Sequence, residues 1–307
     1  MTSFIGFATV TRLGASTTEV AIVRDGAVHF IDEVHVPAPG MATSVDDMLP
    51  EWPAWSQWLA RFHASAIAAP DRRAQVRFCP PLLRSPTLYC AGGNYQEHLQ
   101  GVISGAPVPK KPYHFVSPAQ RMIGHDRGIR RPPGCSQLDW EVELAIIIGR
   151  RAECVTEDAA LRYVAGYAVA NDISARDLFV RDDVPFRLDF MRGKGHGGTL
   201  PIGPVVVPAS SIENPQSLAI RLSVNRQVMQ DSSTAKMIFS CARQISELSH
   251  MTPLLPGDVI ITGTPAGVGM ERNIYLKDGD QLVCEIERVG TLSNFVEVAG
   301  AAPAMRA

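Results

Sequence analysis

The chain has 307 residues, and its 29 Lys and Arg side chains nearly balance its 31 Asp and Glu side chains, giving a formal net charge of −2 at pH 7. A hydrophobic fraction of 46% and a charged fraction of 20% are typical of a folded globular protein with one or two domains. The sequence has no basic run interleaved with aromatic residues, which argues against a nucleic-acid partner, and no stretch of about 18 apolar residues that would predict a membrane helix. Its 6 cysteines are scattered without a Cys-x-x-Cys pair, so neither a zinc knuckle nor a disulfide framework is expected. We therefore expect a cytoplasmic enzyme that acts on a small molecule.

Residues 1–80 are expected to form a small N-terminal α/β domain. Apolar and polar residues alternate at 19–23 and 27–31, on either side of an Arg-Asp-Gly turn, which predicts a β-hairpin. A helix should follow, because tryptophans and other large apolar residues recur at helical spacing between positions 52 and 62, after the cap candidates Ser44 and Asp46. Such a stripe of tryptophans is typical of core packing. Prolines at 80 and 81 then mark a boundary.

Residues 81–300 predict a second, larger domain built mostly from short strands. Paired glycines and prolines bound many of these segments, and convincing helical periodicity is rare. The regular alternation of strand and helix found in doubly wound sheets is missing, so a mixed β-roll or barrel-like α+β architecture, rich in β-structure, is favoured. Residues 301–307 are expected to form a frayed tail. The expected strands are 87–90, 142–148, 164–170, 205–207, 218–224, 259–262 and 281–286.

Three carboxylates alternate in the run Asp139-Trp-Glu141-Val-Glu143, which leads directly into an apolar segment. In a β-strand, alternate residues share a face, so all three acids would point the same way. Like charges crowded beside a buried strand repel one another and call for a cation. Hard oxygen donors favour Mg²⁺, Mn²⁺ or Ca²⁺ over zinc. The run therefore predicts a divalent-metal site, and the alternative is a half-exposed strand with an acidic outer face.

A fourth acid, Asp172, ends another apolar segment at 164–170. At the end of a strand it would supply the third carboxylate of an octahedral site with Glu141 and Glu143, leaving positions for substrate and water. Asn and Asp after a strand are also common in turns and helix caps, which is the alternative role. Arg176 follows closely and is either part of the site or part of a structural ion pair.

Further polar groups stand in glycine-rich or turn segments. Lys194 and His196 lie among four glycines, which let the backbone approach a ligand closely, so that Lys194 would act as a fixed cation near an oxyanion. Thr264 sits in a turn after a predicted strand, where its hydroxyl is suited to binding a carboxylate. His98 is expected on a short helix, with a titration range suited to a general base. Each of these segments would otherwise be an ordinary surface loop.

Taken in chain order, these motifs resemble the fumarylacetoacetate hydrolase family. The matching segments are Asp-x-Glu-x-Glu-Leu, Ala-Asn-Asp-x-Ser-Ala-Arg-Asp, Gly-Lys followed by Pro-Ile-Gly-Pro, and Pro-Gly-Asp-x-Ile-x-Thr-Gly-Thr-Pro-Ala-Gly-Val-Gly, within residues 80–298. The resemblance implies a β-roll catalytic domain at 81–300, a homodimer, and Mg²⁺ or Mn²⁺ held by Glu141, Glu143 and Asp172. Asp139 would then support the ligands without being one.

The resemblance also implies an activity on a small oxo acid. The main expectation is a metal-dependent hydrolase, similar to acylpyruvases and fumarylpyruvate hydrolases of aromatic compound catabolism, that cleaves a C–C bond in a 1,3-diketo or acylpyruvate-type acid through a metal-bound enolate. The alternative is a decarboxylase, hydratase or tautomerase of the same family. The implied catalytic residues are His98, Lys194 and Arg176, and the implied substrate contacts are Thr264, Tyr95 and His196. A binding protein without activity is disfavoured, because converging acids without a metal are costly.

Three positions depart from the family pattern. Many members have a glutamate three residues after the histidine, whereas this chain has Gly101, so His98 is expected to lack its orienting carboxylate. Ser117 stands where a lysine is common, which removes a cation close to the substrate. His196 and the glycines after it replace a Phe-Asp-Thr type sequence, so His196 is a candidate replacement base.

Overall fold

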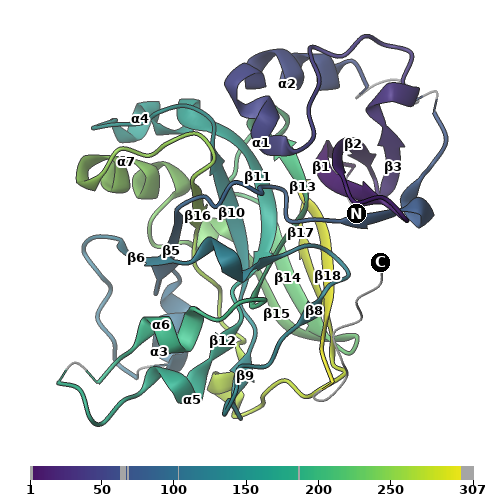
Figure 1. Cartoon of the computed structure of the whole chain (residues 1–307). Coiled ribbons are helices and arrows are strands. Elements are labelled where there is room, and N and C mark those ends of the chain that lie inside the picture. Colours follow the sequence, from purple (N-terminus) through teal and green to yellow (C-terminus); the bar gives the residue numbers. More distant parts are fainter. Residues whose placement is uncertain (1–2, 63–66, 68, 103, 186, 299–307) are drawn as a thin grey trace.

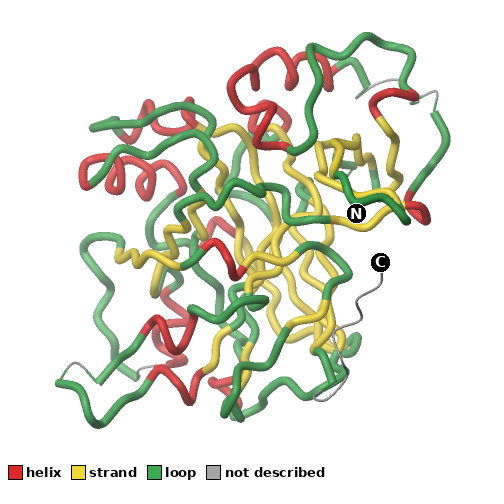
Figure 2. The backbone as a smooth tube through the Cα atoms, in the orientation of Figure 1, coloured by secondary structure: helices red, strands yellow, loops and turns green. Residues whose placement is uncertain are grey.

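The structure is a computed structural model that describes residues 3–62, 67, 69–102, 104–185 and 187–298 (Figure 1). The tail expected at residues 301–307 lies outside the described residues. Strands form the interior of the molecule and short helices lie around it, as Figure 2 shows. No helix among the described residues is long and apolar enough to cross a membrane. The α+β, strand-rich fold class is as the sequence predicts.

The N-terminal strands contain the predicted hairpin and one strand more. Strands β1 (Ile5–Arg12), β2 (Thr18–Arg24) and β3 (Ala27–Phe30) pair antiparallel in sequence order. Asp25 and Gly26 join β2 to β3 with φ angles of 53° and 90°. Positive φ at both central residues is what a type I′ turn requires, and the twist of that turn matches the paired strands. The hairpin prediction is confirmed.

Two helices, α1 (Val45–Met48) and α2 (Trp52–Ala60), cover these strands. The tryptophans of α2 surround Phe7, whose ring centroid lies 5.8 Å from that of Trp52. Trp52 also donates from Nε1 to the carbonyl of Ala165 at 2.7 Å, which ties α2 to the central sheet. The tryptophan stripe is therefore core packing, as predicted.

The central sheet has eleven strands and runs through both halves of the chain. Its main path is β3-β2-β1-β13-β11-β10-β16-β5-β6, with β4 beside β1 and β7 beside β13. Phe7 of β1 faces Val206 of β13, so the N-terminal strands extend the sheet of the larger half. The boundary near residue 80 stays a prediction. The other strands are β4 (Val76–Phe78), β5 (Leu88–Gly92), β6 (Tyr113–Ser117), β7 (Met122–Ile123), β10 (Val142–Ile148), β11 (Val164–Asn171), β13 (Leu200–Pro208) and β16 (Val259–Ile261).

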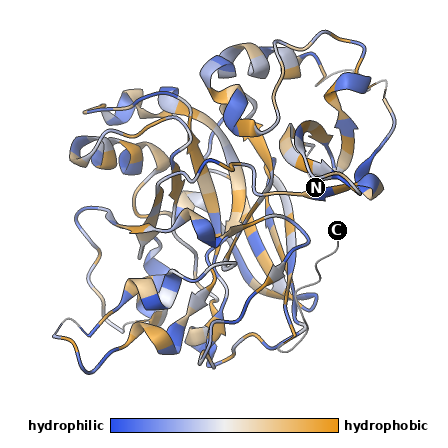
Figure 3. Ribbon diagram, in the orientation of Figure 1, coloured by the Kyte–Doolittle hydropathy of each residue, from blue (hydrophilic) through white to orange (hydrophobic). Residues whose placement is uncertain are grey.

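A second sheet packs across the first to close the β-roll. Its order is β15-β14-β17-β18-β8, and one apolar cluster joins its inner face to β10, β11 and β13. Figure 3 shows hydrophobic residues concentrated along these strands, where the two sheets face each other. A separate pair, β9 with β12, lies at one end. The bounds are β8 (Gly128–Ile129), β9 (Leu138–Asp139), β12 (Ser174–Ala175), β14 (Ala219–Val224), β15 (Gln227–Ser233), β17 (Gln281–Ile286) and β18 (Gly290–Val296).

Of the remaining helices, only the short helix that carries His98 was expected from the sequence. Helix α7 (Cys241–Met251) begins after Ser240, whose hydroxyl accepts from Arg243 N at 3.0 Å, and it buries one face at Ile245 and Leu248. In Figure 1, α4 and α7 lie together at one edge, and α3, α5 and α6 lie at another. The bounds are α3 (Gln96–Val102), α4 (Glu157–Ala160), α5 (Arg176–Phe179) and α6 (Phe190–Lys194), with 3₁₀ turns η1 (Ile31–Glu33), η2 (Leu49–Glu51), η3 (Arg73–Gln75), η4 (Ala119–Arg121), η5 (Leu161–Tyr163), η6 (Ala209–Ser211), η7 (Thr234–Lys236) and η8 (Gly269–Arg272).

Candidate metal centre and active site

The acidic run is interrupted between two strands. Strand β9 ends at Asp139 and β10 begins two residues after Trp140, so the strand expected at 142–148 is confirmed, but the three acids do not lie on one uninterrupted strand as the alternation suggested. At this break, side-chain oxygens accept the backbone hydrogen bonds that a neighbouring strand would otherwise accept. Trp140 N donates to Asp139 Oδ1 at 2.8 Å, and Glu141 N donates to Asn171 Oδ1 at 2.9 Å. The break directs Asp139 away from the other two acids.

Glu141, Glu143 and Asp172 nevertheless meet. Each offers a carboxylate oxygen, these oxygens lie within 4.8 Å of one another, and all three side chains are buried. Strands β10 and β11 pair antiparallel, and Asp172 N, just after β11, donates to Glu141 O at 2.8 Å. The register of this one strand pair therefore assembles the three acids.

Three basic side chains compensate two of these acids. Arg176 Nη2 lies 2.5 Å from Glu141 Oε1, and Lys194 Nζ lies 2.5 Å from Glu141 Oε2. Asp172 has the same arrangement, since Arg121 Nη2 donates to Oδ1 at 2.7 Å and Lys194 Nζ donates to Oδ2. Lys194 therefore bridges the two carboxylates, and one arginine holds the second oxygen of each.

Lys194 reaches this position from the end of the short helix α6. Asp189 begins the helix, and its Oδ1 accepts from Arg192 N at 3.0 Å. A Cβ atom at Gly193 would lie 2.4 Å from the ring of Phe179, so glycine lets α6 approach α5. The glycine-rich segment is thus a packed helix end that carries Lys194 inward.

Asp139 contacts the triad through an arginine. Its Oδ2 accepts from Arg176 Nε at 2.8 Å, and its Oδ1 accepts from Gly269 N at 2.6 Å. Arg176 in turn binds Glu141. Asp139 therefore lies where it can support the acids, outside the group whose oxygens converge.

Glu143 is the acid with an excess of negative charge around it. Among the described residues it makes no ion pair, and burial followed by the carboxylates of Asp172 and Glu141 raises the pKa of Glu143 well above its ordinary value. Burial acts the same way on Glu141, but Lys194 and Arg176 outweigh it, so the pKa of Glu141 lies below its ordinary range. Burial alone would lower the pKa of Lys194, but the two bridged carboxylates raise it.

The donor set suits a hard divalent cation. Carboxylate oxygens are the ligands that Mg²⁺ and Mn²⁺ prefer, and here three of them converge. Gly263 N donates to Glu143 Oε2 and fixes the orientation of that side chain. A cation at this point would neutralise the charge excess that raises the pKa of Glu143. Glu141, Glu143 and Asp172 therefore fit a divalent ion of the predicted kind.

His98 has a carboxylate partner from a distant part of the chain. Its Nδ1 lies 3.0 Å from Glu271 Oε1, and each of the two side chains is 12% exposed. Glu271 Oε2 accepts from Gly267 N at 2.7 Å, so both carboxylate oxygens are engaged. The expectation that His98 lacks an orienting carboxylate is therefore wrong: Gly101 supplies none, but Glu271 on η8 does.

A buried cation, Arg121, lies beside Ser117. Arg121 is 0% exposed, and its Nη1 donates to Ser117 Oγ at 2.9 Å. Its Nη2 binds Asp172. Arg121 was not among the residues singled out from the sequence. The available signal was a basic residue four positions after Ser117, which itself stands where a lysine is common. Position 117 itself lacks a cation, as predicted, but Arg121 brings one to its hydroxyl and to Asp172.

The three predicted substrate contacts have different surroundings. Thr264 Oγ1 donates to Val142 O at 2.9 Å and accepts from Gln230 Nε2 at 2.9 Å, so its hydroxyl takes part in the fold. The hydroxyl of Tyr95 is buried without a hydrogen-bond partner among the described residues. His196 Nε2 lies 2.7 Å from the carbonyl of Arg192 on the preceding helix. Their roles toward substrate stay predictions.

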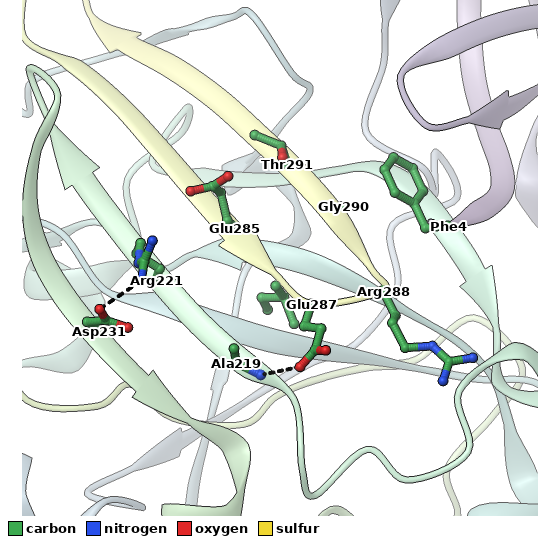
Figure 4. Close-up of a pocket in the computed structure, with 10 residues that line it drawn as sticks. Phe4, Ala219, Arg221, Asp231, Glu285, Glu287, Arg288, Gly290 and Thr291 are labelled. Carbon is green, nitrogen blue, oxygen red and sulfur yellow. Dashed lines mark hydrogen bonds and ion pairs between the residues drawn. The ribbon is translucent and has the colours of Figure 1, made fainter. Parts of the chain in front are cut away.

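A pocket of about 510 Å³ lies elsewhere, on the second sheet (Figure 4). It is crossed by an ion pair of 2.9 Å between Arg221 and Asp231, and Glu287 Oε2 accepts from Ala219 N at 3.2 Å beside it. None of the predicted site residues lines it. Arg221 and Asp231 in its lining thus bind one another, and the candidate chemistry lies at the triad.

Comparisons with known proteins agree with the site geometry. Residues 87–297 match the family model described as fumarylacetoacetate (FAA) hydrolase C-terminal. The chain is 38% identical over 226 residues to the mitochondrial oxaloacetate tautomerase FAHD2A of Bos taurus, covering 73% of this chain and 70% of that protein. The structure of a fumarylacetoacetate hydrolase from Exiguobacterium antarcticum matches with a TM-score of 0.79 at 29% identity, over 96% of this chain and 99% of that chain.

A further solved structure is informative about ligands. Fumarylpyruvate hydrolase from Pseudomonas aeruginosa, in complex with Mn²⁺ and pyruvate, matches with a TM-score of 0.64 at 29% identity, over 77% of this chain and 94% of that chain. The family model covers most of the chain, and its span contains the acid triad, Lys194, and the histidine–glutamate pair. The chain therefore belongs to the fumarylacetoacetate hydrolase family.

Proposed function

We propose that this protein is a divalent-metal-dependent tautomerase that interconverts the enol and keto forms of an oxaloacetate-type 2-oxo acid. The observation that carries the proposal is the buried triad of Glu141, Glu143 and Asp172, in a chain that also holds His98 against a carboxylate. The similarity to the Bos taurus oxaloacetate tautomerase supports this choice of reaction.

The charges around the triad favour an anionic substrate once an ion is bound. With a divalent ion bound and Asp139, Glu141, Glu143 and Asp172 all ionised, the four carboxylates, the three basic side chains and the ion would sum to one positive charge. The ion would supply Lewis-acid polarisation of the substrate oxygens. Lys194, already fixed between Glu141 and Asp172, is the protein group placed to contact an oxyanion there.

His98 is the proposed proton carrier. The tautomer that fits Glu271 has its proton on Nδ1, which leaves the lone pair on Nε2. Among the described residues, Nε2 makes no hydrogen bond. In the keto-to-enol direction, Nε2 would take a proton from C3 while the C2 oxygen gains one from solvent, and in the reverse direction Nε2 would give a proton to C3 while the C2 hydroxyl loses its proton to solvent.

The direct test follows the absorbance of enol-oxaloacetate after mixing with enzyme. We expect ketonisation faster than the buffer-catalysed rate, loss of this acceleration in EDTA, and recovery with Mn²⁺ or Mg²⁺. Asp172→Asn should abolish it, whereas the matched control Glu285→Gln, on the second sheet, should retain it. A rate equal to that of the buffer at every metal concentration, together with no calorimetric binding of Mn²⁺, would contradict the proposal.

Hydrolysis of an acylpyruvate is the second candidate. The His98–Glu271 pair favours it, because a histidine held by a carboxylate is suited to activating water as well as carbon acids. Water would add to the acyl carbonyl, the C–C bond to the pyruvyl carbon would break, and a carboxylic acid and pyruvate would form. Incubation with an acylpyruvate and with oxaloacetate separates the reactions: two acids indicate hydrolysis, CO₂ indicates decarboxylation, and a change of enol absorbance without new products indicates tautomerisation.

We also propose that the protein is a cytoplasmic homodimer, as its family resemblance and composition lead us to expect. The Bos taurus relative is named as mitochondrial, so the two proteins would differ in compartment. Light scattering of the purified protein tests the dimer, and a mass of one chain would contradict it.

A further inference from the structure

We propose that Arg121 is a positioning residue that determines which ions the metal site accepts. It limits Asp172 to one ligand oxygen, and this favours a small octahedral ion, Mg²⁺ or Mn²⁺, over Ca²⁺. The inference rests on the proposed function only in taking the acid triad as the site of a divalent ion. It does not depend on which oxo acid the enzyme converts.

The guanidinium of Arg121 is enclosed between three segments that meet beside the triad. The side chain is 0% exposed, and its Nη2 donates to Asp172 Oδ1 at 2.7 Å and to the carbonyl of Ile173 at 3.0 Å. Its Nη1 donates to Ser117 Oγ at 2.9 Å, and its Nε donates to Thr199 Oγ1 at 3.1 Å. A guanidinium that moved away from Oδ1 would leave these buried groups unpaired, so it is held against Asp172.

The two hydroxyls that accept from Arg121 are themselves oriented by the glycine-rich segment. Ser117 Oγ donates to Lys194 O at 3.1 Å, and Thr199 Oγ1 donates to His196 O at 2.6 Å. A hydroxyl whose proton is already given to a carbonyl presents its lone pairs to a donor such as the guanidinium. A longer side chain at position 117 would overlap the guanidinium, so the serine is part of what holds Arg121 in place.

The other two acids of the triad are also held at one oxygen by a donor that is not an ion. Arg176 Nη2 lies 2.5 Å from Glu141 Oε1, and Gly263 N donates to Glu143 Oε2. All three carboxylates therefore have one oxygen engaged by an arginine or a backbone amide. A carboxylate held in this way is poorly placed to turn both of its oxygens toward the same ion.

One oxygen of each acid is left for the ion. Glu141 Oε2 and Asp172 Oδ2 face each other, since both contact Lys194 Nζ, and Glu143 Oε1 makes no hydrogen bond among the described residues. Mg²⁺ requires near-octahedral geometry at about 2.0–2.1 Å, whereas Ca²⁺ takes about six to eight oxygens at about 2.3–2.6 Å, often both oxygens of one carboxylate. A site with one oxygen per acid therefore suits Mg²⁺ and Mn²⁺ better than Ca²⁺.

The ratio of two affinities separates this effect from that of charge. Removal of Arg121 takes away a positive charge, which should strengthen the binding of any divalent cation. Mn²⁺ and Ca²⁺ carry the same charge, so this contribution cancels in the ratio of their Kd values, and the change in available ligand oxygens remains. Loss of a group that orients a ligand typically changes metal affinity about 10- to 100-fold. We expect Arg121→Met to lower the ratio of the Ca²⁺ Kd to the Mn²⁺ Kd roughly 10-fold.

Calorimetric titration with Mn²⁺ alone and with Ca²⁺ alone measures this ratio in wild type, Arg121→Met and the matched control Arg131→Met. Arg131 also binds a carboxylate and a carbonyl, at 3.1 Å from Asp278 Oδ1 and 2.8 Å from Leu276 O, but these partners lie outside the triad. Wild type and Arg131→Met should prefer Mn²⁺ to the same degree, and Arg121→Met should lose most of that preference. The same ratio in all three proteins would overturn the inference.

A second measurement needs only the wild-type protein, and it decides the question if Arg121→Met does not fold. Crystal structures of wild type with Mn²⁺ and with Ca²⁺ identify the oxygens that bind each ion. We expect Asp172 to bind through Oδ2 alone, with Arg121 still on Oδ1. Binding through both oxygens of Asp172 would overturn the inference alone, and binding of neither ion would overturn the proposed function with it. Lack of tautomerase activity with the expected ratio and coordination would contradict only the proposed function.

Discussion

Replacement of Lys194 by methionine removes one charge from the centre of the site and keeps most of the side-chain volume. Lys194 is 7% exposed and bridges Glu141 and Asp172, so Lys194→Met leaves two buried carboxylates with one arginine each. Breaking a buried ion pair by removing one partner costs about 3–5 kcal/mol. Because Arg176 and Arg121 remain, we expect the lower end of that range.

In EDTA, a loss of about 3 kcal/mol would lower Tm by roughly 5 °C, because an unfolding entropy of about 2.1 cal/mol/K per residue amounts to about 0.64 kcal/mol/K for 307 residues. A divalent ion would supply the missing positive charge to the same carboxylates. An ion at a hundred times its Kd stabilises the folded state by about 2.7 kcal/mol. Since the ion no longer meets a neighbouring ammonium group in the variant, Lys194→Met should gain more stability from Mn²⁺ than wild type does.

Calorimetric melting of both proteins in EDTA and in a Mn²⁺ series measures this difference. Lys236→Met is the matched control, because Lys236 is 52% exposed and its pair with Glu97 should contribute under about 1 kcal/mol. If Lys194→Met melts with wild type in EDTA, Lys194 does not compensate the buried acids. Equal stabilisation of both proteins by Mn²⁺ would show that the ion does not take over the charge of the lysine.

Four further outcomes are expected. Because the pKa of Glu143 is raised well above its ordinary value, Mn²⁺ binding at about pH 6 should release a proton, and the affinity for Mn²⁺ should fall as pH falls. Calorimetry in buffers of different ionisation enthalpy would show this proton release in wild type and none in Glu143→Gln. Phe7→Ala should cost about 3–5 kcal/mol in urea unfolding, because Phe7 is 0% exposed beneath the tryptophans of α2, and a loss below about 1 kcal/mol would contradict that packing. His196→Ala should keep kcat/KM within about twofold, since its Nε2 is bonded to a backbone carbonyl, and a large loss would restore His196 as a candidate base. Hydrogen bonds from neighbouring histidine and arginine side chains hold the pKa of Asp126 at about 2. Ionised Asp126 therefore stabilises the fold at pH values above its ordinary pKa of 3.8, and this stabilisation is lost as pH falls toward 2. The urea midpoints of wild type and Asp126→Asn should differ above pH 3.8 and converge as the pH approaches 2.

The meeting of the three acids could be predicted because it depends on local pattern and on one strand pair. Glu141 and Glu143 are spaced by two beside a fully apolar segment, and Asp172 ends the next apolar segment along the chain. Antiparallel pairing of neighbouring segments then brings them together, with Val142 opposite Asn171. Both the periodicity and the succession of the two segments along the chain are visible in the sequence.

The partners from distant segments could not be predicted in the same way. Glu271 lies 173 positions from His98, and Arg121 lies 51 positions from Asp172. No periodicity connects residues so far apart, and their contact depends on how η8 and η4 pack on the roll. The same reason explains the break at Trp140, because the neighbouring Asp139 is engaged by the amide of Gly269, 130 positions later. A missing side chain in a motif was thus a weak guide to a missing interaction.

Asp139 connects the metal site to the proposed base. Its oxygens accept from the amides of Gly269 and Met270, at the start of the same 3₁₀ turn that carries Glu271 two residues later. The other side of Asp139 binds Arg176, which holds Glu141. The turn that orients His98 and the carboxylate proposed to hold the ion are therefore fixed by one buried acid, whose pKa is raised by burial against the opposing effect of Arg176. Asp139, which is not itself a ligand, thus adds a buried contact that fixes η8 relative to the triad, and a carboxylate on η8 can orient a histidine only if η8 is fixed.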